Sequence, residues 1–176
     1  MTSWVPMVSA ILGGAVTLSA VYFTNKWNAD RFDKQLKHER KKENSKLFLE
    51  KGEELDELLS IWSKTNFLVK RNQLLVVKGK LTEVQLLEIV SKHSNKNNHD
   101  RLEVLLNIYF PEQVIYMEEA IKIRAKGNAA YDDFISGKLE CKTAFIIIHN
   151  SEVGFSDKID DLRKSIRDRL HKLIES

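Results

Sequence analysis

Hydrophobic and polar positions divide this chain into three regions with different patterns. Residues 1–25 contain no Asp, Glu, Lys, Arg or His, whereas residues 26–46 are dense in charge. Beyond them, apolar side chains recur every three or four residues, which is the period of a helix with one buried face. The pattern predicts an all-α protein with a transmembrane anchor over 1–25, a basic helical stalk over 26–46 and a helical bundle over 47–176.

The uncharged stretch has the length of a transmembrane helix. Residues 5–23 are apolar or small, and about 20 such residues cross the roughly 30 Å of hydrocarbon in a bilayer. Trp4 stands at one end and Tyr22 and Trp27 at the other, where such side chains prefer the membrane interfaces. A cleaved signal peptide and a buried core helix are the alternatives, but no Lys or Arg precedes the stretch as in a signal peptide. We expect a retained single span.

Charge asymmetry predicts the orientation of the span. Basic side chains follow it and none precedes it: Lys26, Arg31, Lys34, Lys37, Arg40, Lys41 and Lys42. Because cytoplasmic flanks are rich in Lys and Arg, we expect a single-pass membrane protein with its amino terminus outside and its carboxyl-terminal domain in the cytoplasm. Part of this run is expected to bind anionic headgroups, although a topology signal with a solvated face is the simpler explanation. This part, called the basic cluster below, consists of Lys34, Lys37, Arg40, Lys41 and Lys42.

Small residues recur along the predicted span. Ser9, Gly13 and Thr17 are spaced by four, and so are Ala10 and Gly14. Small residues at this spacing allow two helices to approach closely in lipid, so we expect the span to self-associate. The alternative is that such residues are simply common in single spans.

Apolar side chains predict a helix of about thirty residues that begins near Phe48 and ends near Gly79. One stripe has a spacing of seven: Phe48, Leu55, Trp62, Val69 and Val76. Leu58, Ile61, Leu68 and Leu75 stand beside that stripe. The face is wider than a two-position seam, which favours a bundle over an isolated coiled coil.

Capping signals divide the remainder into shorter helices. Thr82 and Gln85 form a capping box for a helix that fades by Ser94 into a polar loop, "NKNN". Asp100 is expected to cap the next helix, and Pro111 to start another. The expected buried side of this last helix is Val114, Met117, Ile121 and Ala125.

The carboxyl-terminal region is predicted to contain two further helices. Residues 139–153 contain "AFIII", which is compatible with a strand or a helix, and we expect a helix because no partner strand is evident. A final helix is expected from Ser156. Its apolar stripe is Ile159, Leu162, Ile166, Leu170 and Leu173.

Composition and motifs point away from catalysis. The chain has 28 basic and 25 acidic side chains, a near balance that gives no reason to expect a nucleic-acid partner. Cys141 is the only cysteine, so an intrachain disulfide is excluded, and no catalytic base is evident beside it except the distant His149. No zinc-like spacing is present around the other candidate ligands, which are His93, His99, Asp100 and Glu103. We therefore expect no catalytic residue, no cofactor and no metal.

Three stretches carry a resemblance: "TNKWNADRFDKQLKHERKKE", "EKGEELDELLSIW" and "IYFPE". In these stretches the chain resembles short bacterial proteins that are helical, anchored in the inner membrane and without an assigned function. The resemblance implies a bacterial inner-membrane setting and brings no catalytic residues with it.

The sequence thus predicts a membrane-tethered, non-catalytic interaction or assembly subunit that forms homo-oligomers and recruits a cytoplasmic protein partner. One alternative is a membrane-perturbing effector, such as a toxin or an anti-phage defence component, whose transmembrane helices cluster on triggering. Gly13 and Gly14 motivate that alternative. A weaker option is an enzyme without a recognisable motif, which a polar pocket in the bundle would indicate.

Overall fold

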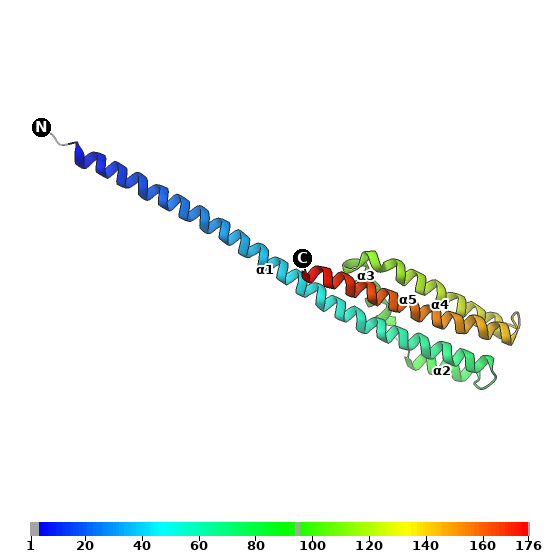
Figure 1. Ribbon diagram of the computed structural model, residues 1–176. Coiled ribbons are helices and arrows are strands. Elements are labelled where there is room, and N and C mark those ends of the chain that lie inside the picture. The colour runs from blue at the N-terminus through cyan, green and yellow to red at the C-terminus, as the bar shows by residue number, and fades with distance from the viewer. Residues whose placement is uncertain (1–3, 94–95, 176) are drawn as a thin grey trace. The chain divides into compact units, whose positions relative to one another are not determined.

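The computed structural model describes residues 4–93 and 96–175, and over these ranges it consists of helices joined by short connections, without strands (Figure 1). The all-α fold class is therefore confirmed. The elements are α1 (Val5–Val77), α2 (Glu83–His93), α3 (Lys96–Tyr109), the 3₁₀ turn η1 (Pro111–Gln113), α4 (Val114–Ile135) and α5 (Cys141–Glu175).

The chain separates into two compact units, Met1–Lys46 and Leu47–Ser176. The first unit contains the amino-terminal part of α1, and the second contains the remainder of α1 and all later helices. Within the described part of the chain, no helix combines the length and the hydropathy that a membrane crossing requires. The side chains of residues 5–9 and of Ile11 lie outside that part, so the span expected within 1–25 stays a prediction.

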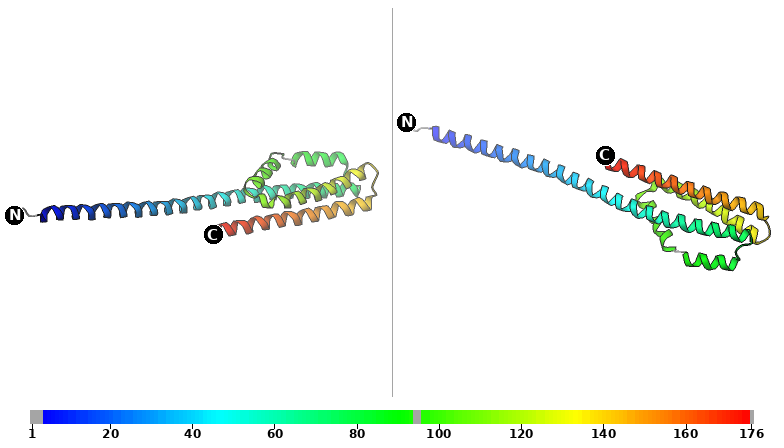
Figure 2. Two further views of the ribbon diagram at one scale, coloured as in Figure 1. Left: turned by 90° about the horizontal axis from the view of Figure 1, so that it is seen from above. Right: turned by 60° about the horizontal axis from the view of Figure 1, so that its bottom comes forward.

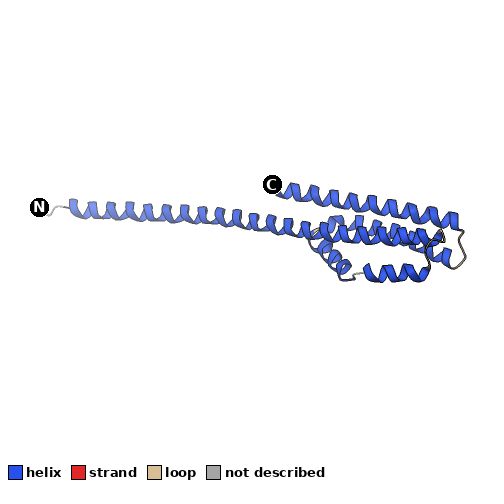
Figure 3. Cartoon of the chain, turned by 90° about the horizontal axis from the view of Figure 1, so that it is seen from below, coloured by secondary structure: helices blue, strands red, loops and turns tan. Residues whose placement is uncertain are grey.

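The second unit is an antiparallel helical bundle. Figure 2 shows α4 and α5 lying alongside the carboxyl-terminal part of α1. Helices α2 and α3 follow one another back along α1, in the opposite direction. Figure 3 shows the same arrangement from another side, with helices throughout. The start of α5 meets the end of α1, where the Cys141 thiol donates a hydrogen bond to the Val77 carbonyl over 3.2 Å. The predicted helical bundle is confirmed.

Glycines in the left-handed region end two of the helices. Gly79 has φ = 66°, and the backbone N–H of Lys80 returns to the carbonyl of Leu75 over 2.9 Å. Gly137, with φ = 74°, ends α4 in the same way. Such a residue after the last turn lets the chain satisfy carbonyls that the helix leaves open. The predicted helix end near Gly79 is confirmed.

The capping box at the start of α2 is also confirmed. The Thr82 N–H donates to Gln85 Oε1 over 2.9 Å, and the Gln85 N–H donates to Thr82 Oγ1 over 3.3 Å. Each side chain thus satisfies a backbone donor of the other residue, which fixes where the chain turns into the helix.

Three predicted helix starts are wrong. Phe48 does not start a helix, because α1 runs without a break from Val5 to Val77. Asp100 does not cap α3, because α3 already begins at Lys96 and takes in most of the expected polar loop, whose remaining residue lies outside the described residues. Ser156 does not start a helix, because α5 runs without a break from Cys141. The expected helix within 139–153 is confirmed from Cys141 onward. Neither the start of α3 nor the stretch of α5 around Ser156 contains a proline, or a glycine with positive φ, that would force a break in the helix.

The buried faces of α1 and α4 differ in part from the prediction. On α4, Met117 is buried as expected, but Ile121 and Ala125 are exposed and Ala120 and Gly127 are buried instead. Two successive spacings of four residues, from Met117 to Ile121 and from Ile121 to Ala125, drift off the buried face of a helix with 3.6 residues per turn. On α1, Ile61 is exposed, whereas several other predicted core positions are half-buried: Phe48, Leu58, Leu68, Val69 and Leu75. The predicted stripe of the final helix is correct, because its first three members are buried and its last two half-buried.

Two apolar clusters form the core of the bundle. The larger cluster joins α1, α3, α4 and α5 and is centred on Leu59, Leu105, Phe110, Phe155 and Leu162. The smaller cluster joins the ends of α1 and α4 to α2 and to the start of α5, and includes Val76, Val77, Leu86, Tyr131 and Ile148. The buried residues of α1 between the two clusters, Asn66, Lys70 and Gln73, are polar.

Candidate functional site

A buried polar layer separates the two apolar clusters. On α1 it consists of Asn66, Lys70 and Gln73, which are at most 6% exposed. These residues continue the buried stripe from Trp62 to Val77 at spacings of three and four, so they occupy positions that apolar side chains would normally fill. Helices α4 and α5 contribute Gly127, Asn128 and Ser151.

The ammonium group of Lys70 is the centre of this layer. It is fully buried and donates hydrogen bonds to Asn128 Oδ1 (2.6 Å), Gln73 Oε1 (3.2 Å) and the backbone carbonyl of Arg124 (3.4 Å). All three acceptors are neutral oxygens. The pKa of Lys70 is lowered to about 8, mainly by burial and further by the positive charge of Arg124, while Asp132 opposes the shift.

Gly127 provides the space for the lysine. A Cβ atom at Gly127 would overlap the Ser151 hydroxyl and would lie 2.7 Å from Ser151 Cβ and 2.9 Å from Lys70 Nζ. The Ser151 hydroxyl donates to the carbonyl of Ile148 over 2.7 Å, so it is bonded to its own helix. Helices α4 and α5 therefore approach each other closely beside the lysine only because residue 127 has no side chain.

Arg124 covers the layer on the side of the larger cluster. Its guanidinium lies 5.7 Å from the centre of the Trp62 ring, within the range of a cation–π contact. Burial lowers the pKa of Arg124. Two cationic side chains thus lie close together inside the bundle, and the charge of each makes the other more costly to bury.

The layer does not have the form of an active site. A lysine with a pKa near 8 has the chemistry of a base or a nucleophile, but the Lys70 side chain is sealed from solvent and has no route to a substrate. Within the described residues, no group of three or more His, Cys, Asp or Glu side chains is arranged to hold a metal ion.

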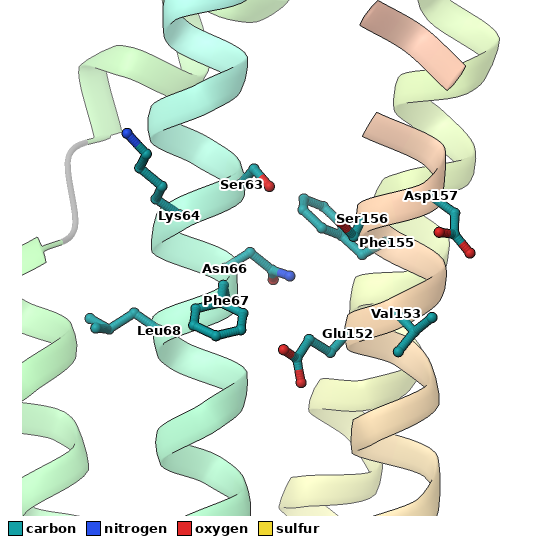
Figure 4. A pocket seen from close by; sticks show the side chains of 10 residues that line it. All are labelled: Ser63, Lys64, Asn66, Phe67, Leu68, Glu152, Val153, Phe155, Ser156 and Asp157. Atoms are coloured by element: carbon teal, nitrogen blue, oxygen red, sulfur yellow. The ribbon is translucent and has the colours of Figure 1, made fainter. Parts of the chain in front are cut away.

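A groove of about 660 Å³ opens beside the layer, between α1 and α5. Figure 4 shows the side chains that line it, and Asn66 belongs both to the groove and to the polar layer. Two buried donors on this stretch of α1, Trp62 Nε1 and Asn66 Nδ2, have no hydrogen-bond partner among the described residues. The groove, unlike the lysine, is open to a ligand.

The small residues predicted for self-association lie on an open helix face where they are described. A Cβ atom at Gly13 or Gly14 would meet no atom within 4 Å. The Thr17 hydroxyl donates to the carbonyl of Gly13 over 2.8 Å. Ala10 is exposed, and the side chain of Ser9 lies outside the described residues. The basic cluster is exposed throughout.

The polar layer was not among the predicted sites, because apolar periodicity does not mark buried positions that polar residues occupy. The available signal was that Asn66, Lys70 and Gln73 follow Trp62 at the same three- and four-residue spacing as the apolar stripe. Gly127 gave a second signal, as a glycine in the interior of a long helix.

No protein-family model matches this chain, and neither a curated protein nor a solved structure is detectably similar to it. The resemblance to short membrane-anchored bacterial proteins therefore stays a prediction. The fold and the site define a helical bundle with a buried polar layer.

Proposed function

We propose that this protein is a single-pass protein of the bacterial inner membrane that acts by binding and not by catalysis. Residues 5–23 cross the bilayer, the basic cluster lies at its cytoplasmic surface, and the bundle in the cytoplasm recruits a protein partner. The protein assembles into homo-oligomers through its span.

The observation that carries this proposal is the row of exposed apolar side chains at the beginning of α1. Leu12, Val16 and Leu18 are 61% to 72% exposed, and Trp4, Val21, Tyr22 and Phe23 are also exposed. Removing a large apolar side chain from water is favourable by about 1.5–3 kcal/mol. For this row of side chains the total free energy of transfer out of water is on the order of 10 kcal/mol. Lipid supplies such a cover, and the sequence of 5–23 has the matching length.

The polar groups of this stretch also suit a lipid environment. The hydroxyls of Thr17 and Ser19 donate to the carbonyls of Gly13 and Ala15, each over 2.8 Å. A hydroxyl that is bonded to its own helix does not need water, and the helix satisfies the backbone groups.

The bundle has exposed apolar side chains that support the recruitment of a partner. Val84 and Leu87 on α2 and Ile108 on α3 are all more than 60% exposed. The fully buried cores of protein interfaces are more apolar than the rest of a protein surface, so exposed apolar side chains suit this role. The sealed state of Lys70 supports binding over catalysis for the same domain.

A membrane-perturbing effector is the second candidate function. The open face at Gly13 and Gly14 favours it, because helices that pack closely through small residues can cluster when they are triggered. Leucine at both positions should then abolish toxicity on overexpression, whereas a recruiting subunit should lose no more than its oligomer. Ala15→Leu, on another side of the same helix, serves as the matched control.

The test is purification of the tagged full-length protein from native membranes in mild detergent, with identification of everything that accompanies it. A stoichiometric second protein that is lost in a Val84→Asp/Leu87→Asp variant supports recruitment. Recovery of the protein in the soluble fraction, without detergent, contradicts the membrane anchor.

A further inference from the structure

The groove between α1 and α5 has an apolar wall. Phe67 of α1 and Val153 of α5 line it and are about half exposed, and the buried Phe155 lies beneath them. The volume of about 660 Å³ lies within the range of about 300–1,000 Å³ that is typical of small-molecule sites. An aromatic or aliphatic group of a ligand would cover the exposed side chains here.

A buried amide gives this groove a specific polar contact. Asn66 is only 5% exposed, and its Nδ2 group has no hydrogen-bond partner among the described residues. Figure 4 shows the side chain pointing from α1 toward α5, across the floor of the groove. An unsatisfied buried donor typically costs about 1–3 kcal/mol, and a ligand oxygen that accepts from it would remove that cost.

A carboxylate gives the groove its charge. Figure 4 shows Glu152 pointing across the groove toward α1, whereas Lys64 and Asp157 extend away from it. The Glu152 side chain is only 18% exposed, and its contact with His149 is long, at 3.8 Å. A charged group in this partly shielded position favours an opposite charge on a ligand.

We infer that this groove binds a small organic cation that combines an apolar body, a hydrogen-bond acceptor and a protonated amine. The apolar body lies against Phe67 and Val153, the acceptor meets Asn66, and the amine pairs with Glu152. This site is independent of the membrane anchor and of the partner surface on α2 and α3, so its failure would leave the proposed function intact.

The probe for this site is N-(2-aminoethyl)benzamide, which carries a phenyl ring, a carbonyl acceptor and a primary ammonium. The full-length protein is isotopically labelled in lipid nanodiscs, and the side-chain amide signal of Asn66 is followed by NMR during titration. N-ethylbenzamide, which has the same ring and carbonyl but no amine, serves as the matched compound. Glu152→Gln tests the charge, and Glu57→Gln, at an exposed position of α1 outside the groove, is the matched variant.

We expect the probe to shift the Asn66 signal saturably, with an affinity at least fivefold higher than that of N-ethylbenzamide. Glu152→Gln should lower the affinity for the probe at least fivefold, and Glu57→Gln should leave it unchanged. No saturable shift, equal binding of the two compounds, or an unchanged affinity in Glu152→Gln would overturn the inference. So would binding of the acetylated tripeptide Phe-Lys-Phe at least tenfold more tightly than the probe, which would assign the groove to a protein segment.

Discussion

The two parts of α1 depart from the usual distribution of side chains in opposite directions. In the first unit, apolar side chains such as Leu12 and Leu18 are exposed, at 61% and 72%. In the second unit, Lys70 of the same helix is fully buried. Burial along one continuous helix is therefore decided by what covers each turn and not by the type of residue. Both arrangements are unfavourable unless other groups offset them. The exposed apolar side chains need an apolar environment to cover them, and the buried lysine needs hydrogen-bond acceptors.

The compensation for Lys70 is visible in the bundle. Three neutral oxygens accept its hydrogen bonds, and Gly127 leaves room for it. The compensation for the apolar row of the first unit comes, in our proposal, from lipid. Both kinds of compensation can be tested by substitution.

The largest effect should follow from placing charge in the proposed span. In a Leu12→Asp/Val16→Asp variant, each aspartate should cost roughly 3 kcal/mol in the membrane, so the protein should leave the membrane fraction on alkaline carbonate extraction. Gln35→Asp, at an exposed position of the stalk outside the basic cluster, should stay in the membrane pellet. Retention of the double variant in that pellet would show that lipid does not cover this row.

The buried lysine should make stability depend on pH. Lys70 has a pKa of about 8 when folded and about 10.4 when unfolded, so between these values the unfolded chain binds more protons. The free energy of unfolding should therefore rise with pH across this window, by up to about 3 kcal/mol. Lys70→Met should remove this rise, whereas Lys122→Met, at an exposed position of α4, should retain it. Urea unfolding of the full-length protein in detergent measures the difference, and equal slopes in all three proteins would refute it.

Two glycines inside helices offer a matched comparison of packing. Alanine at Gly127 meets Ser151 and Lys70, and should lower the free energy of unfolding by about 1–3 kcal/mol through overpacking. Alanine at Gly154, where the nearest atom would be 3.5 Å away, should instead stabilise the protein by up to about 1 kcal/mol, the usual preference of a helix for alanine. The same urea titrations test both variants. A stabilising Gly127→Ala would mean that the lysine layer is loosely packed.

The smallest effect is expected at the capping box of α2, which contains neither the exposed apolar row nor the buried lysine. Thr82→Ala removes the acceptor of the Gln85 N–H and should cost about 1 kcal/mol, whereas Thr82→Ser should retain most of the stability. Thermal unfolding followed by circular dichroism distinguishes the two. Equal melting temperatures for Ala and Ser would show that the hydrogen bonds of this box contribute nothing to stability.

The parts of the fold that could be predicted are those decided by local chemistry. Thr82 and Gln85 bond each other across one turn, and Gly79 ends α1 because it adopts a positive φ without strain. The apolar stripe from Ile159 to Ile166 has no polar residue at its buried positions, so periodicity alone located it.

The candidate site could not be predicted in the same way, because it depends on contacts between distant segments. Whether Lys70 faces solvent or the interior is decided by Asn128, which follows it by 58 positions, and by the missing side chain of Gly127. The groove at Asn66 likewise forms only when α5 lies beside α1. Apolar periodicity cannot distinguish a polar residue on a solvated helix face from a buried one whose neighbours supply its hydrogen bonds.

Cysteine labelling tests the central claim most directly, because Cys141 is the only cysteine of the chain and is exposed. Spheroplasts that express the full-length protein are treated with a membrane-impermeant maleimide, before and after lysis. The same treatment is applied to a Cys141→Ser/Ser3→Cys variant. We expect Cys141 to react only after lysis, whereas the cysteine placed at position 3 should react in intact spheroplasts. Labelling of both sites only after lysis, or of Cys141 before it, would contradict a span with its amino terminus outside and its bundle inside.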